Sequence, residues 1–199
     1  MRFFYATLAL ASLALNTPLA SEEAGHRQLG AHVHGQGSLK IAIEGNKLDM
    51  EFEAPGADIV GFEHEAGSSA QKALVEKAKV TLGEVLTLFK MPSNAGCKVE
   101  KATVEIRNEE QHHHDEGHAA GTAKNESGAK DDEHGGHSEF HAQYSLTCTS
   151  AANLTTIETT YFKAFAAAQQ LNVSVVAAKG QWQMQLTRKK TTLTLGGLM

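Results

Sequence analysis

Residues 38–53 read SLKIAIEGNKLDMEFE, and this stretch decides the fold. Apolar residues alternate with polar ones on both sides of the central pair Gly45-Asn46. A period of two places every apolar side chain on one face of a strand, and a Gly-Asn pair is typical of a two-residue hairpin turn. The sequence therefore predicts a β-hairpin with one buried face.

After this hairpin the apolar period lengthens to that of a helix over residues 68–90, with a possible capping box at Ser68 and Gln71. Strand patterns return over residues 97–107 and 140–148, and a change of parity predicts a β-bulge near Glu100. The remaining expected elements are strands at 154–157, 173–177, 182–186 and 192–195, and a second helix over about 160–170. The pattern predicts an α+β fold: a mainly antiparallel sheet with two helices and a long disordered His-rich insert.

The chain of 199 residues divides into three kinds of segment. Residues 1–20, with Arg2 followed by a short apolar run and a small residue at Ala20, have the features of a cleaved signal peptide. Because a membrane span needs about 20 apolar residues, no span is expected in the mature chain. Residues 21–108 and 139–199 are expected to form one folded domain, interrupted by an insert over residues 109–138.

The charge and cysteine content of the chain exclude some classes of function. The formal net charge is −5 and no run of basic residues is longer than three, which argues against nucleic-acid binding. In an oxidising compartment Cys97 and Cys148 have only each other to pair with, so we expect a disulfide. The competing interpretation, two thiolate metal ligands, is disfavoured because exported thiols tend to oxidise.

The insert is the first chemical feature. Seven of the eleven histidines fall between residues 109 and 141: His112, His113, His114, His118, His134, His137 and His141. No large apolar residue occurs between residues 111 and 138, so nothing there offsets the entropy of ordering. Neutral imidazole binds zinc, copper and nickel, which indicates a metal-binding arm without choosing the metal. The alternative is a solvated, pH-buffering tract.

The second feature is a pair of short histidine motifs. His32 and His34, two positions apart, lie on the same side of an extended chain. His64 could complete a three-histidine set, with Glu63, Glu65 or water in the fourth position of a tetrahedral zinc site. In a rival arrangement, His137 and His141 reach back and complete this site. Each histidine alone is more often an ordinary surface residue.

These motifs resemble zinc-uptake proteins of the ZrgA type. The resemblance rests on Gly30 to Gly35, Val60 to His64, Gly96-Cys97, the His-rich insert, Tyr144 to Cys148, and the Phe162-x-x-Phe165 segment. It implies a periplasmic protein that binds Zn(II) and feeds an envelope transporter for zinc uptake. It also implies that His32, His34 and His64 are motif histidines, whereas the insert has no matching positions.

The sequence raises three candidate functions. The first is a soluble, monomeric, periplasmic zinc-capture protein, with a defined site in the folded domain and the insert as collecting arm or store. The second is a less selective copper- or nickel-binding or detoxifying chelator, because ligand type alone favours copper over zinc. The third, a zinc hydrolase, lacks a His-Glu-x-x-His helix and a second catalytic constellation, so no enzyme is expected.

Overall fold

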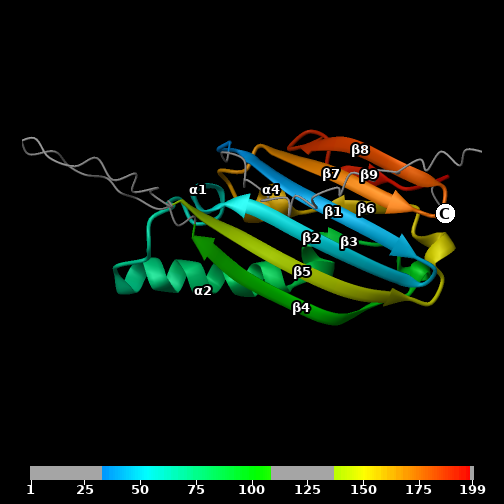
Figure 1. Ribbon diagram of the computed structural model, residues 1–199, viewed down its shortest axis with the longest axis horizontal. Coiled ribbons are helices and arrows are strands. Elements are labelled where there is room, and N and C mark those ends of the chain that lie inside the picture. The colour runs from blue at the N-terminus through cyan, green and yellow to red at the C-terminus, as the bar shows by residue number, and fades with distance from the viewer. Residues whose placement is uncertain (1–32, 109–136, 198–199) are drawn as a thin grey trace, which may run out of the picture. The chain divides into compact units, whose positions relative to one another are not determined.

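A six-stranded sheet with strand order β4-β5-β2-β1-β7-β8 forms the body of the protein (Figure 1). The computed structural model describes residues 33–108 and 137–197. The strands of this sheet are β1 (Gln36–Glu44), β2 (Lys47–Pro55), β4 (Cys97–Asn108), β5 (Ser138–Cys148), β7 (Gln170–Ala177) and β8 (Gly180–Thr187). A smaller sheet has the order β3 (Phe89–Lys90), β6 (Thr156–Thr159) and β9 (Thr192–Thr194).

The strand pairing confirms the predicted hairpins. β1 pairs with β2 around Gly45-Asn46, and β7 pairs with β8, both antiparallel. β4 and β5 are antiparallel with a register shift between Val99 and Lys101, which confirms the bulge expected near Glu100. Among the described strands, β1 and β7 form the single parallel pair, which the local sequence patterns did not predict.

The two faces of the large sheet differ in chemistry. Leu39, Ile41 and Phe52 are at most 2% exposed and belong to a core shared with the helices and the smaller sheet. Because side chains alternate along a strand, the intervening polar residues occupy the opposite face. The register places Ser38 beside Glu53, and Glu53 beside His141. Carboxylate and imidazole side chains from separate strands, which are possible metal ligands, therefore share the polar face of the sheet.

The helices differ from the prediction. Four are present in the described residues rather than two: α1 (Gly56–Ile59), α2 (Ser69–Gly83), α3 (Val85–Leu88) and α4 (Tyr161–Ala164). The capping box of Ser68 and Gln71 is confirmed, but the helix expected to continue to residue 90 stops at Gly83. Glu84 leaves the helical conformation (φ −84°, ψ 60°), and the new direction buries Val85 and Leu88 in the core.

The helix expected over residues 160–170 is only one turn long. Phe165 is already extended, and Gln169 and Gln170 donate their backbone N–H groups to the carbonyl of Gly35. These two N–H groups therefore bond to the residue before β1 and are not available to continue the helix. No described helix has the length and apolar character needed to cross a membrane.

The predicted disulfide is confirmed. Cys97 is bonded to Cys148, and the two residues face each other at one end of the β4–β5 pair. Asn108 and Ser138 face each other at the other end, where the insert is attached. Residues 1–20 of the expected signal peptide and residues 109–136 of the insert lie outside the described residues.

The disulfide makes a testable contribution to stability. The bonded cysteines are 51 positions apart, and closing a loop of this length restricts the unfolded chain. We expect the double variant Cys97→Ala/Cys148→Ala to lose about 4 kcal/mol of unfolding free energy in urea titrations. Reduced wild type should lose a similar amount. A loss below about 1 kcal/mol would show that the bond constrains little.

Candidate metal centres

Two imidazoles meet on one carboxylate at the end of the large sheet. Nε2 of His34 lies 2.9 Å from Oε1 of Glu63, and Nδ1 of His137 lies 2.6 Å from Oε2. His34 precedes β1, Glu63 follows α1, and His137 immediately precedes β5. The Glu63 side chain is 12% exposed, whereas those of His34 and His137 are 66% and 54% exposed. We call these three residues the loop cluster.

Gly56 allows this meeting. The backbone N–H of Ser138 donates to the carbonyl of Glu63 at 3.0 Å, which joins the start of β5 to the loop after α1. A Cβ atom on Gly56 would lie 2.5 Å from Oγ of Ser138 and 2.6 Å from the carbonyl oxygen of Phe62. Only a residue without a side chain fits between these two segments, so Gly56 permits Glu63 and His137 to approach.

The surroundings of Glu63 keep it ionised. Burial raises the pKa of its carboxyl, but the interactions with His137 and His34 lower the pKa by more, leaving it below its usual range. At neutral pH Glu63 is therefore an anion in contact with two solvent-accessible imidazoles. Such a group can bind a cation that arrives from solvent.

A second group lies on the polar face of the sheet. Nε2 of His141 is 2.7 Å from Oε1 of Glu51 and 3.6 Å from Oε1 of Glu53, and the His141 side chain is 2% exposed. Within the described residues, this is the one trio whose ligand atoms all lie within 4.8 Å of one another. The hydrogen bond with His141 lowers the pKa of Glu51 below its usual range, against the effect of burial. We call this trio the sheet-face cluster.

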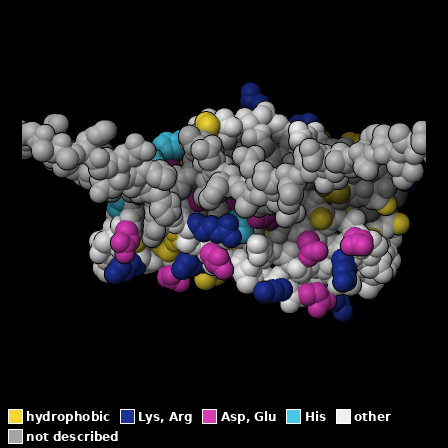
Figure 2. All heavy atoms as spheres, in the orientation of Figure 1, with side chains coloured by type: hydrophobic (Ala, Val, Ile, Leu, Met, Phe, Trp, Pro, Cys, Tyr) yellow, Lys and Arg dark blue, Asp and Glu magenta, His cyan; other side chains and the backbone are white. Residues whose placement is uncertain are grey.

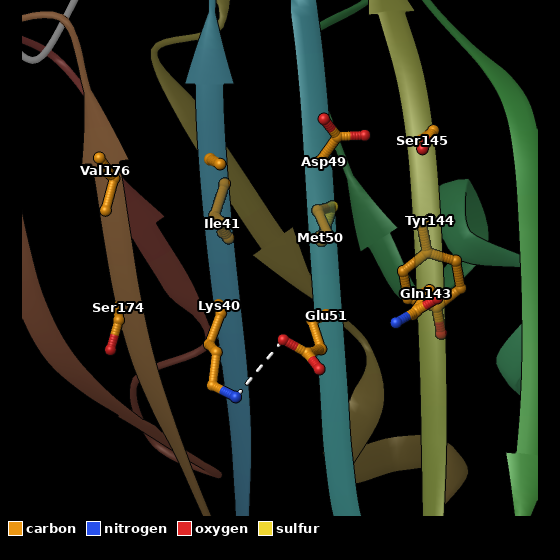
Figure 3. A pocket seen from close by; sticks show the side chains of 11 residues that line it. Lys40, Ile41, Asp49, Met50, Glu51, Gln143, Tyr144, Ser145, Ser174 and Val176 are labelled. Atoms are coloured by element: carbon orange, nitrogen blue, oxygen red, sulfur yellow. Dashed lines mark hydrogen bonds and ion pairs between the residues drawn. The ribbon is translucent and has the colours of Figure 1, made fainter. Parts of the chain in front are cut away.

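A lysine already neutralises part of the sheet-face cluster. Nζ of Lys40 lies 3.4 Å from Glu51 and 3.5 Å from Glu53. Lys40 and Glu51 also line a hollow of about 520 Å³ on the sheet, where the lysine points toward the carboxylate (Figure 3). Acidic and basic side chains are interspersed on the visible face, with histidine among them (Figure 2). A metal ion at this cluster would compete with the ammonium group.

The structure separates the histidines that the sequence grouped together. His34 and His137 share Glu63, whereas His141 contacts Glu51. The contacts of His64 lie elsewhere: Nδ1 is 2.9 Å from the carbonyl oxygen of Glu65, and the ring stacks on Phe62 at 4.9 Å. The proposed ligands His32, His112, His113, His114, His118 and His134 lie outside the described residues.

Sequence reasoning missed Glu51, Glu53 and Lys40 as site residues. Their alternation with apolar neighbours already placed them on the polar face of the predicted hairpin. What was missing was the pairing of β2 with β5, which brings His141 beside Glu53. Long-range pairing of this kind cannot be read from local periodicity.

The fold and the two clusters define an α+β protein that carries ligand groups suited to a divalent metal. The profile of the ZrgA family zinc uptake protein matches residues 31–195, and the chain belongs to this family. This confirms the resemblance seen in the sequence, and the matched range contains every residue of both clusters. No curated protein matches the chain.

The role of Gly56 leads to a prediction. We expect Gly56→Ala to lower the free energy of unfolding by about 1–3 kcal/mol in urea titrations, because the added methyl group forces two backbone segments apart. It should also weaken zinc binding at the loop cluster. Gly83→Ala is the matched control, since a Cβ there meets open space. Equal stability and zinc affinity for the two variants would contradict the role assigned to Gly56.

Proposed function

We propose that this protein is a soluble, monomeric periplasmic protein that binds Zn(II) and delivers it to an envelope transporter for uptake. Membership of a zinc-uptake family supports the connection with zinc. We infer a binding role without catalysis. The leader expected over residues 1–20 supports export, which the disulfide also favours.

The observation that carries this proposal is the loop cluster. Glu63 and His137 are 74 positions apart, yet they are in contact, and His34 joins the same carboxylate from a third segment. Two imidazole nitrogens and one carboxylate oxygen are ligands typical of zinc. The exposed imidazoles can turn toward an arriving ion, while the mostly buried carboxylate remains fixed. Capture should weaken below about pH 6, because imidazole must be neutral to bind metal.

Other residues extend this site in the proposal. His32 is two positions from His34, and we propose it as a further ligand. His64 and Glu65 follow Glu63 in the chain, and we propose that they join the site when the His64 ring leaves its stack on Phe62. The remaining histidines of the insert would form a collecting arm or store. Flexible ligands lose entropy when they are ordered around an ion, so the arm should bind more weakly than the folded cluster.

The sheet-face cluster is a candidate for a second, weaker site. It offers one imidazole and two carboxylates, a set richer in oxygen than that of the loop cluster. The ammonium group of Lys40 contacts both carboxylates, so a bound ion must either displace it or experience its electrostatic repulsion. Zinc should therefore fill the loop cluster first.

Calorimetric titration of tag-free protein tests this order. We expect His34→Ala/His137→Ala to abolish the tightest zinc event, because loss of even one ligand should weaken binding more than tenfold, or above about 1.4 kcal/mol. The control Glu51→Gln/Glu53→Gln, which alters the other cluster, should keep that event. Wild-type zinc affinity in the histidine variant would contradict the proposal. Tighter retention of copper or nickel in competition would favour the chelator alternative.

Deletion of residues 111–136 tests the role of the arm. Because Asn108 and Ser138 already face each other, a short Gly-containing turn can close the hairpin while His137 and His141 remain. The melting temperature should stay nearly unchanged, and the zinc stoichiometry should fall through loss of weak binding. Disappearance of the tight event would show instead that the insert carries the main ligands.

A further inference from the structure

One turn of the chain carries the longest run of basic residues in an acidic protein. Arg188, Lys189 and Lys190 are consecutive and exposed, whereas the chain as a whole has a formal net charge of −5. Within the described part of the chain, no carboxylate forms an ion pair with any of the three. We call residues 188–190 the basic turn. Its positive charge is presented to the solvent.

The basic turn has a fixed backbone. The N–H of Thr187 donates to the carbonyl of Lys190 at 2.9 Å, and the N–H of Lys190 donates back at 3.0 Å, so Arg188 and Lys189 form a two-residue turn. The guanidinium of Arg188 donates to two backbone carbonyl oxygens, one in α4 and one just after it. A turn held in this way loses less entropy on binding a partner than a flexible loop does.

The basic turn lies at the same end of the large sheet as the loop cluster. Thr187 ends β8 and pairs with Gln170 at the start of β7, and Gln170 pairs in turn with Gln36 at the start of β1. β2 ends and β5 begins at this end of the sheet as well (Figure 1). His34 precedes β1 and His137 precedes β5, so the metal ligands and the basic turn lie at one end of the sheet.

A hollow of about 680 Å³ adjoins both features. Gln169, Arg188 and Lys189 line it together with two alanines. The backbone N–H of Gln169 donates to the carbonyl of Gly35, and a Cβ atom on Gly35 would lie 3.3 Å from the Gln169 side chain. Gly35 directly follows His34. A chain bound in this hollow would therefore lie next to the segment that carries a metal-binding imidazole.

Charge determines the kind of partner that fits this surface. Opposite charges guide association and fix the orientation of a partner, so exposed lysines without carboxylate partners favour an acidic one. An anionic lipid surface would repel the rest of this acidic chain. The exposed large apolar side chains of the described residues include none from the basic turn or the lining of the hollow, and apolar side chains are needed for stable membrane binding. An acidic protein segment is therefore favoured over a membrane.

We propose that the basic turn and the adjoining hollow bind an acidic segment of the protein that receives zinc. The inference rests on the proposed function and adds the chemistry of the partner and the place where it binds. Lys189 and Lys190 contact the carboxylates of the partner, and Arg188 is a positioning residue that holds the turn against α4. Binding here places the receiving protein beside His34 and His137, so the ion can pass directly from the loop cluster.

Lys189→Glu/Lys190→Glu tests the surface on the full chain. The probe is a fluorescent hexaglutamate peptide, titrated into metal-free protein at low salt. Charge reversal should weaken peptide binding by about tenfold or more, and added salt should weaken binding to the wild type because it screens exposed charges. Lys98→Glu/Lys101→Glu is the matched control, because both lysines are exposed on β4, the opposite edge of the sheet. Equal peptide affinity in the two variants would overturn the proposal.

Zinc measurements separate partner binding from metal binding. The variant with glutamates at positions 189 and 190 should keep its melting temperature and bind zinc at least as tightly as the wild type, because the loop cluster is unchanged. In cells without the native copy, it should support much less zinc uptake than the control variant. Lys189→Gln/Lys190→Gln removes the charge without reversing it and decides the matter if the first variant does not fold. Uptake equal to that of the control would contradict the proposal.

The outcomes distinguish this inference from the proposed function. If phosphatidylglycerol vesicles bind through Lys189 and Lys190 and the peptide does not, the surface is a membrane contact and the inference is overturned. If the wild type binds zinc tightly but its peptide binding does not depend on these lysines, the inference fails and the proposed function stands. If the wild type binds no zinc tightly, the proposed function fails, and the assignment of the partner as a zinc receiver fails with it.

Discussion

The antiparallel register between β2 and β5 is the constraint on which the rest of the structure depends. It places His141 beside Glu53 on the polar face, and Pro55 beside Glu139 at the end of the sheet. The second placement brings the residues before β5 to the loop that follows α1, where His137 reaches Glu63. A shift by one residue would turn every ligand on β5 to the opposite face. Both candidate metal centres therefore depend on one strand pairing.

Local patterns predicted much of the fold. The alternation around Gly45-Asn46 and the parity change near Glu100 were confirmed, because turn residues and side-chain period act over a few residues. The parallel pairing of β1 with β7 and the end of α2 at Gly83 depend on distant packing, and the sequence did not reveal them. The same limit applies to the site. Spacing identified His34 and Glu63, whereas Glu51 and Glu53 were missed because their contact with His141 depends on the pairing of β2 with β5.

The loop cluster combines one fixed anion with two accessible imidazoles. Glu63 is mostly buried and held between two segments, while His34 and His137 are more than half exposed. A protein that captures a metal and later releases it needs this combination, because a rigid and fully buried site would exchange its ion slowly. The disulfide at the far end of the β4–β5 pair stabilises the sheet without restricting these histidines. In the proposed function, metal exchange takes place at the end of this strand pair opposite the disulfide.

Anomalous diffraction from zinc-loaded crystals at the zinc absorption edge tests the central claim most directly. We expect the strongest anomalous peak at the loop cluster, with imidazole nitrogens of His34 and His137 about 2.0–2.1 Å away and a carboxylate oxygen of Glu63 at a similar distance. A strongest peak at Glu51, Glu53 and His141, or at histidines of the insert alone, would contradict it.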